Sequence, residues 1–403
     1  MKAVLSAHDL CAGYDGKTVV RNLNLEVFPG HVICLIGPNG AGKTTILRTL
    51  SGLLTPVSGD VRLNGETINA VKAAHKAKEI AVVLTEKTGI SQTSAFDLAA
   101  MGRTPHTGFF GTLSCRDRRI VHEALGLVGA ESLSERSFSS LSDGEKQKVM
   151  IARALSQEPR VIILDEPTSH LDIKHKVEVV RILSRLAQEK GMAVVLSLHD
   201  IDIALKCCQT LLLVKDRNIA ACGSPETIIH ENTIENLYGL SGATYDHTLG
   251  SLELRADAPS TPSDAALYVA AGGGTGIPVY RLLSRAGFHL ATGILHRNDI
   301  DHRVARAMKL TIVDAGSFEP IGGAAVRAAQ TLMNSARHII DAGFPTGPHN
   351  RENIRLLQDA AAAGRRIHSL RPPAETEALY GADSGAVAAL SLHNLQEAVS
   401  RER

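Results

Sequence analysis

The sequence contains no tryptophan, and aromatic residues make up only 3% of its 403 residues. Proteins that bind single-stranded nucleic acid stack its bases on aromatic side chains, and proteins that bind duplexes present a basic surface. The formal net charge is +1, so the second requirement is not met either. We therefore expect no nucleic-acid partner.

Long apolar runs are missing too. No segment approaches the roughly 18 consecutive apolar residues that identify a transmembrane helix, and the opening segment MKAVLSAHDL lacks the apolar core of a signal peptide. The six cysteines include no C-x-x-C pair, which is typical of reduced thiols in a cytosolic protein. If the protein acts at a membrane, we expect it to dock on another protein that spans it.

The length and the apolar content, which is 44%, are sufficient for two domains. The segment RADAPSTPSD at 255–264 is rich in Pro, Ser and Asp, which is linker composition. We predict a first domain over 1–250, a linker over 251–263 and a second domain over 264–403.

The first domain has the pattern of an α/β fold. Segments 3–10 and 18–28 are β-prone, and residues 90–140 carry helical patterns that suggest an inserted helical subdomain. From RVIILDEP to MAVVLSLHD the chain alternates buried strand and amphipathic helix, as a parallel sheet requires.

The strand HVICLIG runs into a glycine-rich loop, GPNGAGKTT at 37–45, which satisfies G-x-x-x-x-G-K-[ST]. Such a loop turns backbone N–H groups towards phosphate oxygens, and the following helix adds its positive end. Lys43 would supply a charge for the β- and γ-phosphates, and Thr44 a hydroxyl for Mg²⁺. A tight turn that binds nothing is the alternative. The candidate nucleotide-binding residues are Gly37, Pro38, Asn39, Gly40, Ala41, Gly42, Lys43, Thr44 and Thr45.

Two acids end a buried strand in VIILDEP at 161–167. Carboxylates in that place are costly unless a cation or a proton is near. Asp165 fits a Mg²⁺ ligand acting through water, and Glu166 fits the group that orients and polarises an attacking water. The alternative is that both acids only cap the next helix.

The segment LSDGEKQ at 141–147 lies just before a helical pattern. Ser142 and the N–H groups of Gly144 and Glu145 would form an anion site at that helix N-terminus. Taken alone, the segment is an ordinary helix cap.

The order and spacing of five segments, namely the glycine loop, LSDGEKQ, VIILDEP, SHLD at 169–172 and LSLHD with His199, resemble the ABC ATPases over about 1–250. The resemblance implies a P-loop ABC-type ATPase domain with a helical subdomain, and ATP and Mg²⁺ as cofactors. It also implies a head-to-tail homodimer, in which each ATP lies between the glycine loop of one copy and the LSDGEKQ signature of the other.

The same resemblance assigns further roles. Tyr14 would stack on adenine, Asp172 would signal between the two sites, and His199 would contact the γ-phosphate. The family usually has Gln where this chain has Thr85 and Glu86, and Glu86 could bind Mg²⁺ directly. The signature also departs from the family, because Asp143 and Glu145 replace the commoner Gly and Gln. The catalytic residues expected on this resemblance are Lys43, Glu166 and His199.

Segments such as MGRTPHTGFFG at 101–111 and LHDIDIAL at 198–205 resemble the ATPases that drive uptake of iron–siderophore complexes, haem or cobalamin. The resemblance implies a peripheral subunit at the cytoplasmic face of the membrane, bound to a permease and indirectly served by a substrate-binding protein. The helical stretch around 88–115 would form the groove for the permease. The alternative is a soluble regulatory ATPase whose second domain senses a ligand.

The second domain repeats the α/β alternation, with strand-like runs at 267–271, 289–295, 310–313, 338–342 and 365–369, which predicts a Rossmann-like domain. Such domains extend some cobalamin- or iron-importer ATPases, to which this one is similar. Its glycines 272, 273, 274 and 276 could admit a phosphate, although G-x-G-x-x-G is incomplete. Asp299 or Asp301 would bind ribose, and Arg297 could meet a phosphate. A regulatory module for an unknown small ligand, a dimer-stabilising appendage and a second enzyme remain open.

Overall fold

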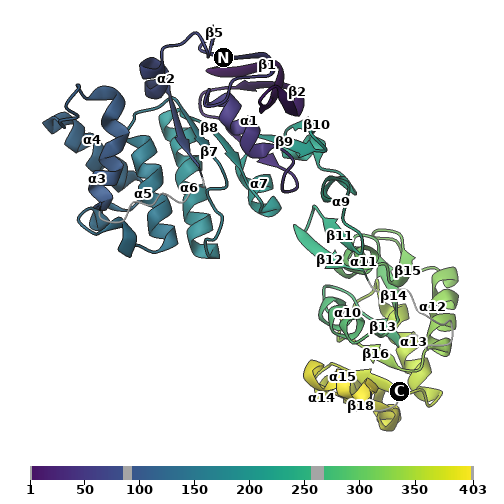
Figure 1. The fold of residues 1–403 in the computed structure, drawn as a ribbon. Coiled ribbons are helices and arrows are strands. Elements are labelled where there is room, and N and C mark those ends of the chain that lie inside the picture. Colours follow the sequence, from purple (N-terminus) through teal and green to yellow (C-terminus); the bar gives the residue numbers. More distant parts are fainter. Residues whose placement is uncertain (1, 85–92, 256–266, 401–403) are drawn as a thin grey trace. The chain divides into compact units, whose positions relative to one another are not determined.

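The computed structural model describes residues 2–84, 93–255 and 267–400. The chain forms two compact units, Met1–Tyr238 and Gly239–Arg403, which are treated one at a time (Figure 1). Within the described residues, no helix is both long and apolar enough to cross a bilayer.

The first unit is built on a mixed sheet with the order β5-β4-β1-β2-β10-β9-β3-β8-β7-β6. One end is an antiparallel meander, and the strands β9, β3, β8, β7 and β6 run parallel. The strands are β1 Leu5–Tyr14, β2 Lys17–Val27, β3 Val32–Ile36, β4 Ser58–Leu63, β5 Glu66–Thr67, β6 Ile80–Val83, β7 Val161–Leu164, β8 Ala193–Ser197, β9 Thr210–Lys215 and β10 Asn218–Gly223.

The central strands are buried on both faces, as their continuous apolar runs predict. Every residue of β3, β7 and β8 is buried. Strands that are covered on both faces have nearly continuous runs of Val, Ile and Leu in their sequences. These three strands therefore form the centre of the first unit.

Helices connect these strands, and three of them form a subdomain of their own. The helices α3, α4 and α5 contact one another, which confirms the predicted helical subdomain (Figure 1). The helical elements of this unit are α1 Lys43–Leu50, α2 Ala73–Glu79, α3 Ala95–Ala100, η1 Met101–His106, α4 Cys115–Leu127, η2 Glu131–Leu133, η3 Phe138–Ser140, α5 Asp143–Leu155, α6 Ile173–Lys190, α7 Ile201–Cys207, α8 Pro225–Ile228 and α9 Thr233–Tyr238.

The second unit contains a parallel sheet with the order β15-β14-β13-β16-β17-β18. Numbered along the chain, this is 3-2-1-4-5-6, the strand order of the Rossmann fold. All five predicted strands are therefore confirmed, and β18 is an addition. The strands are β13 Leu267–Ala270, β14 Leu290–His296, β15 Thr311–Ala315, β16 Ile339–Asp341, β17 Ile367–Ser369 and β18 Val387–Ala389.

Helices cover both faces of this sheet. Leu267 and Val269 of β13 belong to a core cluster with α10, α11 and α15, whereas Tyr268 and Ala270 belong to another with α12, α13 and α14. Alternate residues of a strand point to opposite faces, so two cores follow from one strand. The helical elements are α10 Gly276–Arg285, α11 Ile300–Ala307, α12 Gly323–Ser335, α13 Arg351–Ala362, α14 Pro373–Tyr380, η4 Gly381–Ala386 and α15 Leu392–Ser400.

The boundary between the units differs from the sequence expectation, which ended the first domain at 250 and began the linker at 251. The structure places β11 Ala243–Asp246 and β12 Ser251–Leu254 in the second unit, as an antiparallel hairpin against α11. An ion pair holds this hairpin in the second unit, because the buried Glu253 of β12 pairs with Arg281 of α10. The rest of the predicted linker, 256–263, lies outside the described residues.

Two histidines are buried side by side in the second unit. Nε2 of His368 lies 3.1 Å from Nδ1 of His338, and both side chains are almost fully buried. Burial, together with the neighbouring His338 and Arg366, lowers the pKa of His368 from 6.5 to about 4. The fold therefore holds this histidine neutral.

We expect the second unit to lose stability as the pH falls. The unfolded chain protonates His368 near its ordinary pKa while the folded chain resists, so the free energy of unfolding decreases between about pH 6.5 and pH 4, by on the order of 2–3 kcal/mol. Urea denaturation at about pH 7.5 and about pH 5 measures this. His368→Gln should flatten the dependence, and the exposed His349→Gln should not; equal slopes in both variants would contradict the assignment.

Candidate nucleotide site and associated surfaces

Three neighbouring parallel strands bring the predicted nucleotide-binding segments to one edge of the first sheet. The strand β8 lies between β3 and β7, in register with both. The glycine loop follows β3, His199 follows β8, and the acids Asp165 and Glu166 follow β7. Residues after parallel strands emerge at the same edge, so segments far apart in sequence meet there.

The glycine loop requires its glycines. Gly37, Gly40 and Gly42 have φ angles of 154°, 77° and 108°, where side chains are disfavoured. A Cβ on Gly37 would lie 2.1 Å from the Val214 carbonyl oxygen, and one on Gly42 would lie 2.3 Å from Val20 Cγ2. The loop is therefore clamped between β9 and the β1–β2 hairpin. It carries Pro38, Asn39 and Ala41, and Thr45 lies buried in the first turn of α1.

The ammonium of Lys43 lies within this loop. It donates hydrogen bonds to the carbonyl oxygens of Gly37, at 2.7 Å, and Pro38, at 3.1 Å. Burial lowers its pKa, while Glu166 and Asp165 oppose that effect. The two recorded acceptors of this buried ammonium are neutral carbonyl oxygens. The charged oxygens of a phosphate would accept stronger hydrogen bonds and could replace them.

The carboxylate of Asp165 links the loop to the acid strand. It accepts hydrogen bonds from Thr44 Oγ1 at 2.7 Å and from Ser197 Oγ at 2.7 Å, and Ser197 Oγ accepts one from the Glu166 N–H at 2.9 Å. Hydroxyl and carboxylate oxygens are the donors that Mg²⁺ prefers, so these residues fit that ion. Sequence reasoning missed Ser197, although a serine inside the apolar strand AVVLS was a signal.

The second acid, Glu166, is held by two side chains. Its Oε1 lies 2.5 Å from His199 Nε2, and its Oε2 accepts a hydrogen bond from Ser169 Oγ at 3.0 Å. Its backbone has φ 48°, a conformation that costs free energy in a residue other than glycine. The carboxylate is therefore fixed beside the glycine loop together with His199.

The aromatic Tyr14 closes the β1–β2 hairpin. The turn that follows it is Asp15-Gly16 with φ 49° and 74°, the left-handed pair that a two-residue hairpin needs. Tyr14 is 41% exposed, so solvent or a ligand can reach its side chain. Because the same hairpin contacts the glycine loop at Gly42, Tyr14 belongs to the surroundings of that loop.

The signature residues occupy the N-terminus of α5. Ser142 caps the helix: its N–H donates to Glu145 Oε2 at 2.8 Å, and the Glu145 N–H donates to Ser142 Oγ at 3.3 Å. The bond from the Ser142 N–H lowers the pKa of Glu145. Within the single chain this segment is therefore the helix cap that the sequence allowed as an alternative.

The cap of α6 meets that of α5. Asp172 accepts hydrogen bonds from the His175 N–H at 2.9 Å and pairs with His175 Nδ1 at 2.8 Å. A Cβ on Gly144 would lie 2.5 Å from the His175 ring, so glycine lets the two helices approach. Asp172 and the signature are thus mechanically connected through one histidine. The remaining predicted residues, Thr85 and Glu86, lie outside the described part of the chain.

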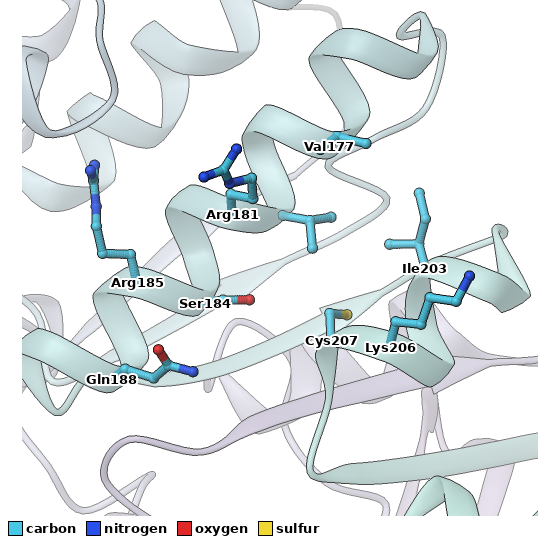
Figure 2. A pocket seen from close by; sticks show the side chains of 9 residues that line it. Val177, Arg181, Ser184, Arg185, Gln188, Ile203, Lys206 and Cys207 are labelled. Carbon is cyan, nitrogen blue, oxygen red and sulfur yellow. The ribbon is translucent and has the colours of Figure 1, made fainter.

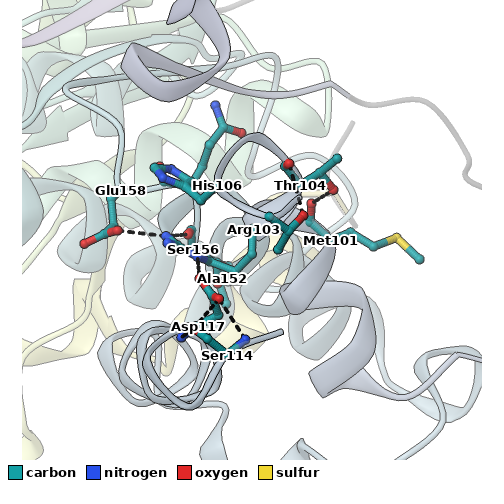
Figure 3. Close-up of polar contacts among 11 residues, drawn as sticks. Met101, Arg103, Thr104, His106, Ser114, Asp117, Ala152, Ser156 and Glu158 are labelled. Carbon is teal, nitrogen blue, oxygen red and sulfur yellow. Dashed lines mark hydrogen bonds and ion pairs between the residues drawn. The ribbon is translucent and has the colours of Figure 1, made fainter. Parts of the chain in front are cut away.

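A buried arginine fixes the segment MGRTPH in the helical subdomain (Figure 3). Arg103 donates to Asp117 Oδ1 at 2.9 Å, to the Ser156 carbonyl oxygen at 2.7 Å and to Glu158 Oε2 at 2.8 Å. Hydrogen bonds from Ser114, with the help of Arg103, lower the pKa of Asp117 to about 2. These bonds join η1, α4 and the end of α5.

Exposed apolar side chains lie on either side of this anchor. Phe109 is 99% exposed, Phe110 is 91% exposed, and Met101 is half exposed. The rings of Phe109 and Phe110 contact each other. Large apolar side chains that lie together in solvent mark interaction surfaces more often than chance, so this pair is a candidate for one.

A groove of about 430 Å³ lies between α6 and α7 (Figure 2). Its lining includes the basic residues Arg181, Arg185 and Lys206, as well as Ile203 and Cys207, and burial raises the pKa of Cys207 to about 11. Of the described residues, none that was predicted for the nucleotide site lines this groove.

The glycine loop of the second unit does not match its predicted role as a phosphate cradle. The N–H of Gly273 donates to Asp299, and those of Gly274, Gly276 and Ile277 donate to the carboxylate of Asp301. These are the donors that a phosphate would need. Arg297, the expected phosphate partner, is bound instead to Asp314 at 2.9 Å. The chain's own carboxylates replace the ligand because Asp301 is fully buried and needs these donors.

Known proteins share both units. Residues 20–169 match the ABC transporter family, and residues 290–401 match the MJ0874 family. A Methanocaldococcus jannaschii protein named uncharacterized ABC transporter ATP-binding protein MJ0873 is 44% identical over 72% of this chain and 100% of its own length. The chain belongs to the ATP-binding proteins of the ABC transporters, and it is an ATPase.

Two further relatives differ in how much of the chain they cover. The cobalamin import ATP-binding protein BtuD of Halobacterium salinarum is 31% identical over 86% of this chain and 87% of its own length. A solved structure provisionally assigned to a metal-chelate type ABC transporter, in an inward-facing conformation, has 27% identity and TM-score 0.53 over 62% of this chain and 95% of its own. Other relatives, named for import of ferric enterobactin, iron(3+)-hydroxamate and hemin, cover 58–64% of this chain.

Removing the hydroxyl that joins the two acids should slow ATP hydrolysis. In Ser197→Ala, Asp165 loses a donor and the Glu166 N–H loses its acceptor, which costs about 1–3 kcal/mol and lowers kcat by about tenfold or more. ATPase assays with equilibrium ATP binding measure this. The matched control is Ser156→Ala, an equally buried serine in the helical subdomain; equal rates in both variants would contradict the role of Ser197.

Proposed function

We propose that this ATPase powers an importer for a metal chelate or corrinoid through a separate permease. The convergence of Lys43, Thr44, Asp165, Glu166 and His199 at the carboxyl ends of β3, β7 and β8 supports the catalytic part. The alternative is a soluble regulatory ATPase with the second unit as its sensor. Co-purification with a polytopic permease distinguishes the two, because a regulatory ATPase would retain activity without one.

ATP binding begins at the glycine loop. Backbone N–H groups of residues 37–45 and the N-terminus of α1 receive the phosphates, and Lys43 exchanges its carbonyl partners for the β- and γ-phosphate oxygens. Tyr14 stacks on the adenine. Thr44, Asp165 and Glu86 are the residues that would hold Mg²⁺, which supplies neutralisation of the phosphate charge when bound.

Hydrolysis uses the pair at the ends of β7 and β8. Glu166 accepts a hydrogen bond from the attacking water and orients it, and His199 contacts the γ-phosphate on the other side. The 2.5 Å contact between the two side chains means that both act as one positioned unit. Ser169 holds the other carboxylate oxygen, which limits rotation of Glu166.

The second copy of the chain completes the site. Ser142, Gly144 and Glu145 of one copy would face the γ-phosphate held by the other, and Asp172 would report between the two sites. The cap bonds between Ser142 and Glu145 would then be exchanged for phosphate contacts. Such an exchange makes closure depend on ATP, because the γ-phosphate supplies the partners.

The exposed apolar surface of Met101, Phe109 and Phe110 is the docking site for the permease. Arg103 of η1 is bonded to α4 and to the end of α5, so movement of the subdomain on ATP binding would carry the neighbouring segment with it. The proposed function implies a peripheral subunit at the cytoplasmic face of the membrane. A substrate-binding protein would meet the permease on the other face.

A corrinoid is the favoured cargo within this class. The first unit holds residues 1–238 of 403, so an alignment over 86% of the chain must run well into the second unit. The relative with that coverage is named for cobalamin import, while those named for iron chelates and hemin cover little more than the first unit. Among these four relatives, the one whose alignment runs furthest into the second unit is named for cobalamin import, which supports a corrinoid as the cargo.

Glu166→Gln should retain ATP binding but lose turnover. The amide keeps the size of the side chain but accepts the water's hydrogen bond weakly, so an ATP-bound dimer accumulates. Light scattering with Mg–ATP detects the dimer, and phosphate release measures the rate. Full turnover in this variant would remove Glu166 from the mechanism. Glu178→Gln on α6, whose partner is Lys148, is the control.

Replacing both exposed phenylalanines, Phe109→Ser with Phe110→Ser, should leave the basal ATPase rate unchanged and abolish most of its stimulation by the permease. Both side chains are almost fully exposed, so the fold loses little when they go. ATPase assays with and without permease in vesicles measure the difference. The control is Phe318→Ser, an exposed phenylalanine of the second unit; equal stimulation in all variants would contradict docking here.

A further inference from the structure

The second unit has a cavity of about 210 Å³ at the point where its strand order reverses. It lies between the loops that follow β13 and β16, and its lining includes Gly272, Gly273, His296, Asp299 and Pro345. In open parallel α/β sheets, ligands bind outside the carboxyl ends of the strands at this reversal. The cavity is smaller than the roughly 300–1,000 Å³ of pockets for drug-sized ligands, which excludes a dinucleotide.

The cavity does not suit a phosphate. Four backbone donors of the glycine loop, those of Gly273, Gly274, Gly276 and Ile277, are already bonded to Asp299 and Asp301. A phosphate would have to displace a fully buried carboxylate, and it would meet the negative charge of Asp299 at the cavity wall. The ligand is therefore one that carries no phosphate.

Two side chains at the cavity wall can accept hydrogen bonds from a ligand. The two asparagines of the wall already have backbone partners: Asn353 accepts from the Ile294 N–H and donates to the Ile294 carbonyl oxygen, at 2.9 Å each, and Asn350 accepts from the Gly347 N–H and donates to the Pro345 carbonyl oxygen. His296 Nε2 lies 3.0 Å from the Glu319 carbonyl oxygen. A carbonyl only accepts, so Nε2 carries the hydrogen and Nδ1 is left as an acceptor.

The second acceptor is the carboxylate of Asp299. It caps α11, and its two oxygens accept from the N–H groups of Gly273 and Asp301. A carboxylate has about four acceptor positions, so capacity remains at the cavity. A ligand with two hydroxyl groups could donate one hydrogen bond to each of these acceptors. Ile294 and Pro345, which also line the cavity, offer apolar contact to a ring.

We propose that this cavity binds the cis-diol of an unphosphorylated nucleoside, with Asp299 as the acceptor for its hydroxyl groups. Asp299 follows the second strand of the unit, where Rossmann domains place the acid that binds ribose. The difference is that Asp301 occupies the phosphate position. The cavity therefore favours nucleosides over nucleotides, and nucleotides bind to the first unit.

Titration calorimetry of the full chain tests this. The chain is first saturated with Mg–ADP, which fills the nucleotide site of the first unit, and adenosine is then added. We expect one adenosine per chain, with 2′-deoxyadenosine binding about tenfold weaker or worse, because a hydroxyl bonded to a charged acceptor is lost. AMP should bind more weakly than adenosine. Absence of adenosine binding, or equal affinity for any two of these ligands, would overturn the proposal.

Two variants locate the site. Asp299→Asn retains a good helix cap and should lose about tenfold or more in adenosine affinity, whereas Asp314→Asn, an acid on β15 outside the cavity, should bind as wild type. Equal affinity in both variants would also overturn the proposal. The comparison of adenosine with 2′-deoxyadenosine uses the unaltered chain, so it tests the proposal even if the Asp299→Asn variant fails to fold. ATP hydrolysis is measured on the same samples, and normal hydrolysis without adenosine binding would leave the proposed transport function intact.

Discussion

The nucleotide site depends on how one carboxylate, Asp165, is satisfied at the end of a fully buried strand. A charge in that position is costly unless donors surround it. Thr44, from the glycine loop, and Ser197, from the neighbouring strand, provide them. The same serine accepts a hydrogen bond from the N–H of Glu166 and so fixes the backbone of the second acid. One hydroxyl thus sets the geometry of both acids.

The second unit also contains a buried acid, but this acid is satisfied by the glycine loop itself. Asp301 is also buried, and it takes its donors from the glycine loop of its own unit. In the first unit, Asp165 takes its donors from two hydroxyl groups, and Lys43 interacts favourably with both acids, which leaves the loop N–H groups for the proposed phosphate. In the second unit, the acid is the permanent occupant of the loop. Two similar strand–glycine–helix segments therefore have different chemistry, and the difference lies in the position of one aspartate.

Much of the fold followed from the sequence because apolar runs and glycines are local signals. The strands of the second unit fell where the runs at 267–271, 289–295 and 338–342 predicted them, and α3 and α4 of the helical subdomain lie within 90–140, whereas α5 follows that range. The hairpin of β11 and β12 was missed. Leu252 and Leu254 face solvent there while Glu253 is buried against Arg281, so the alternation points the wrong way.

By itself the sequence predicted which residues contact ATP, because the order of glycine loop, signature and acids is a property of the chain. It also determined that two domains exist. Only the tertiary structure decided that β8 separates β3 from β7 and places Ser197 between the acids, since strand order depends on packing over the whole sheet. It also decided that Asp299 and Asp301 close the second loop. A glycine shows that backbone N–H groups are accessible, but only the fold shows which acceptor reaches them.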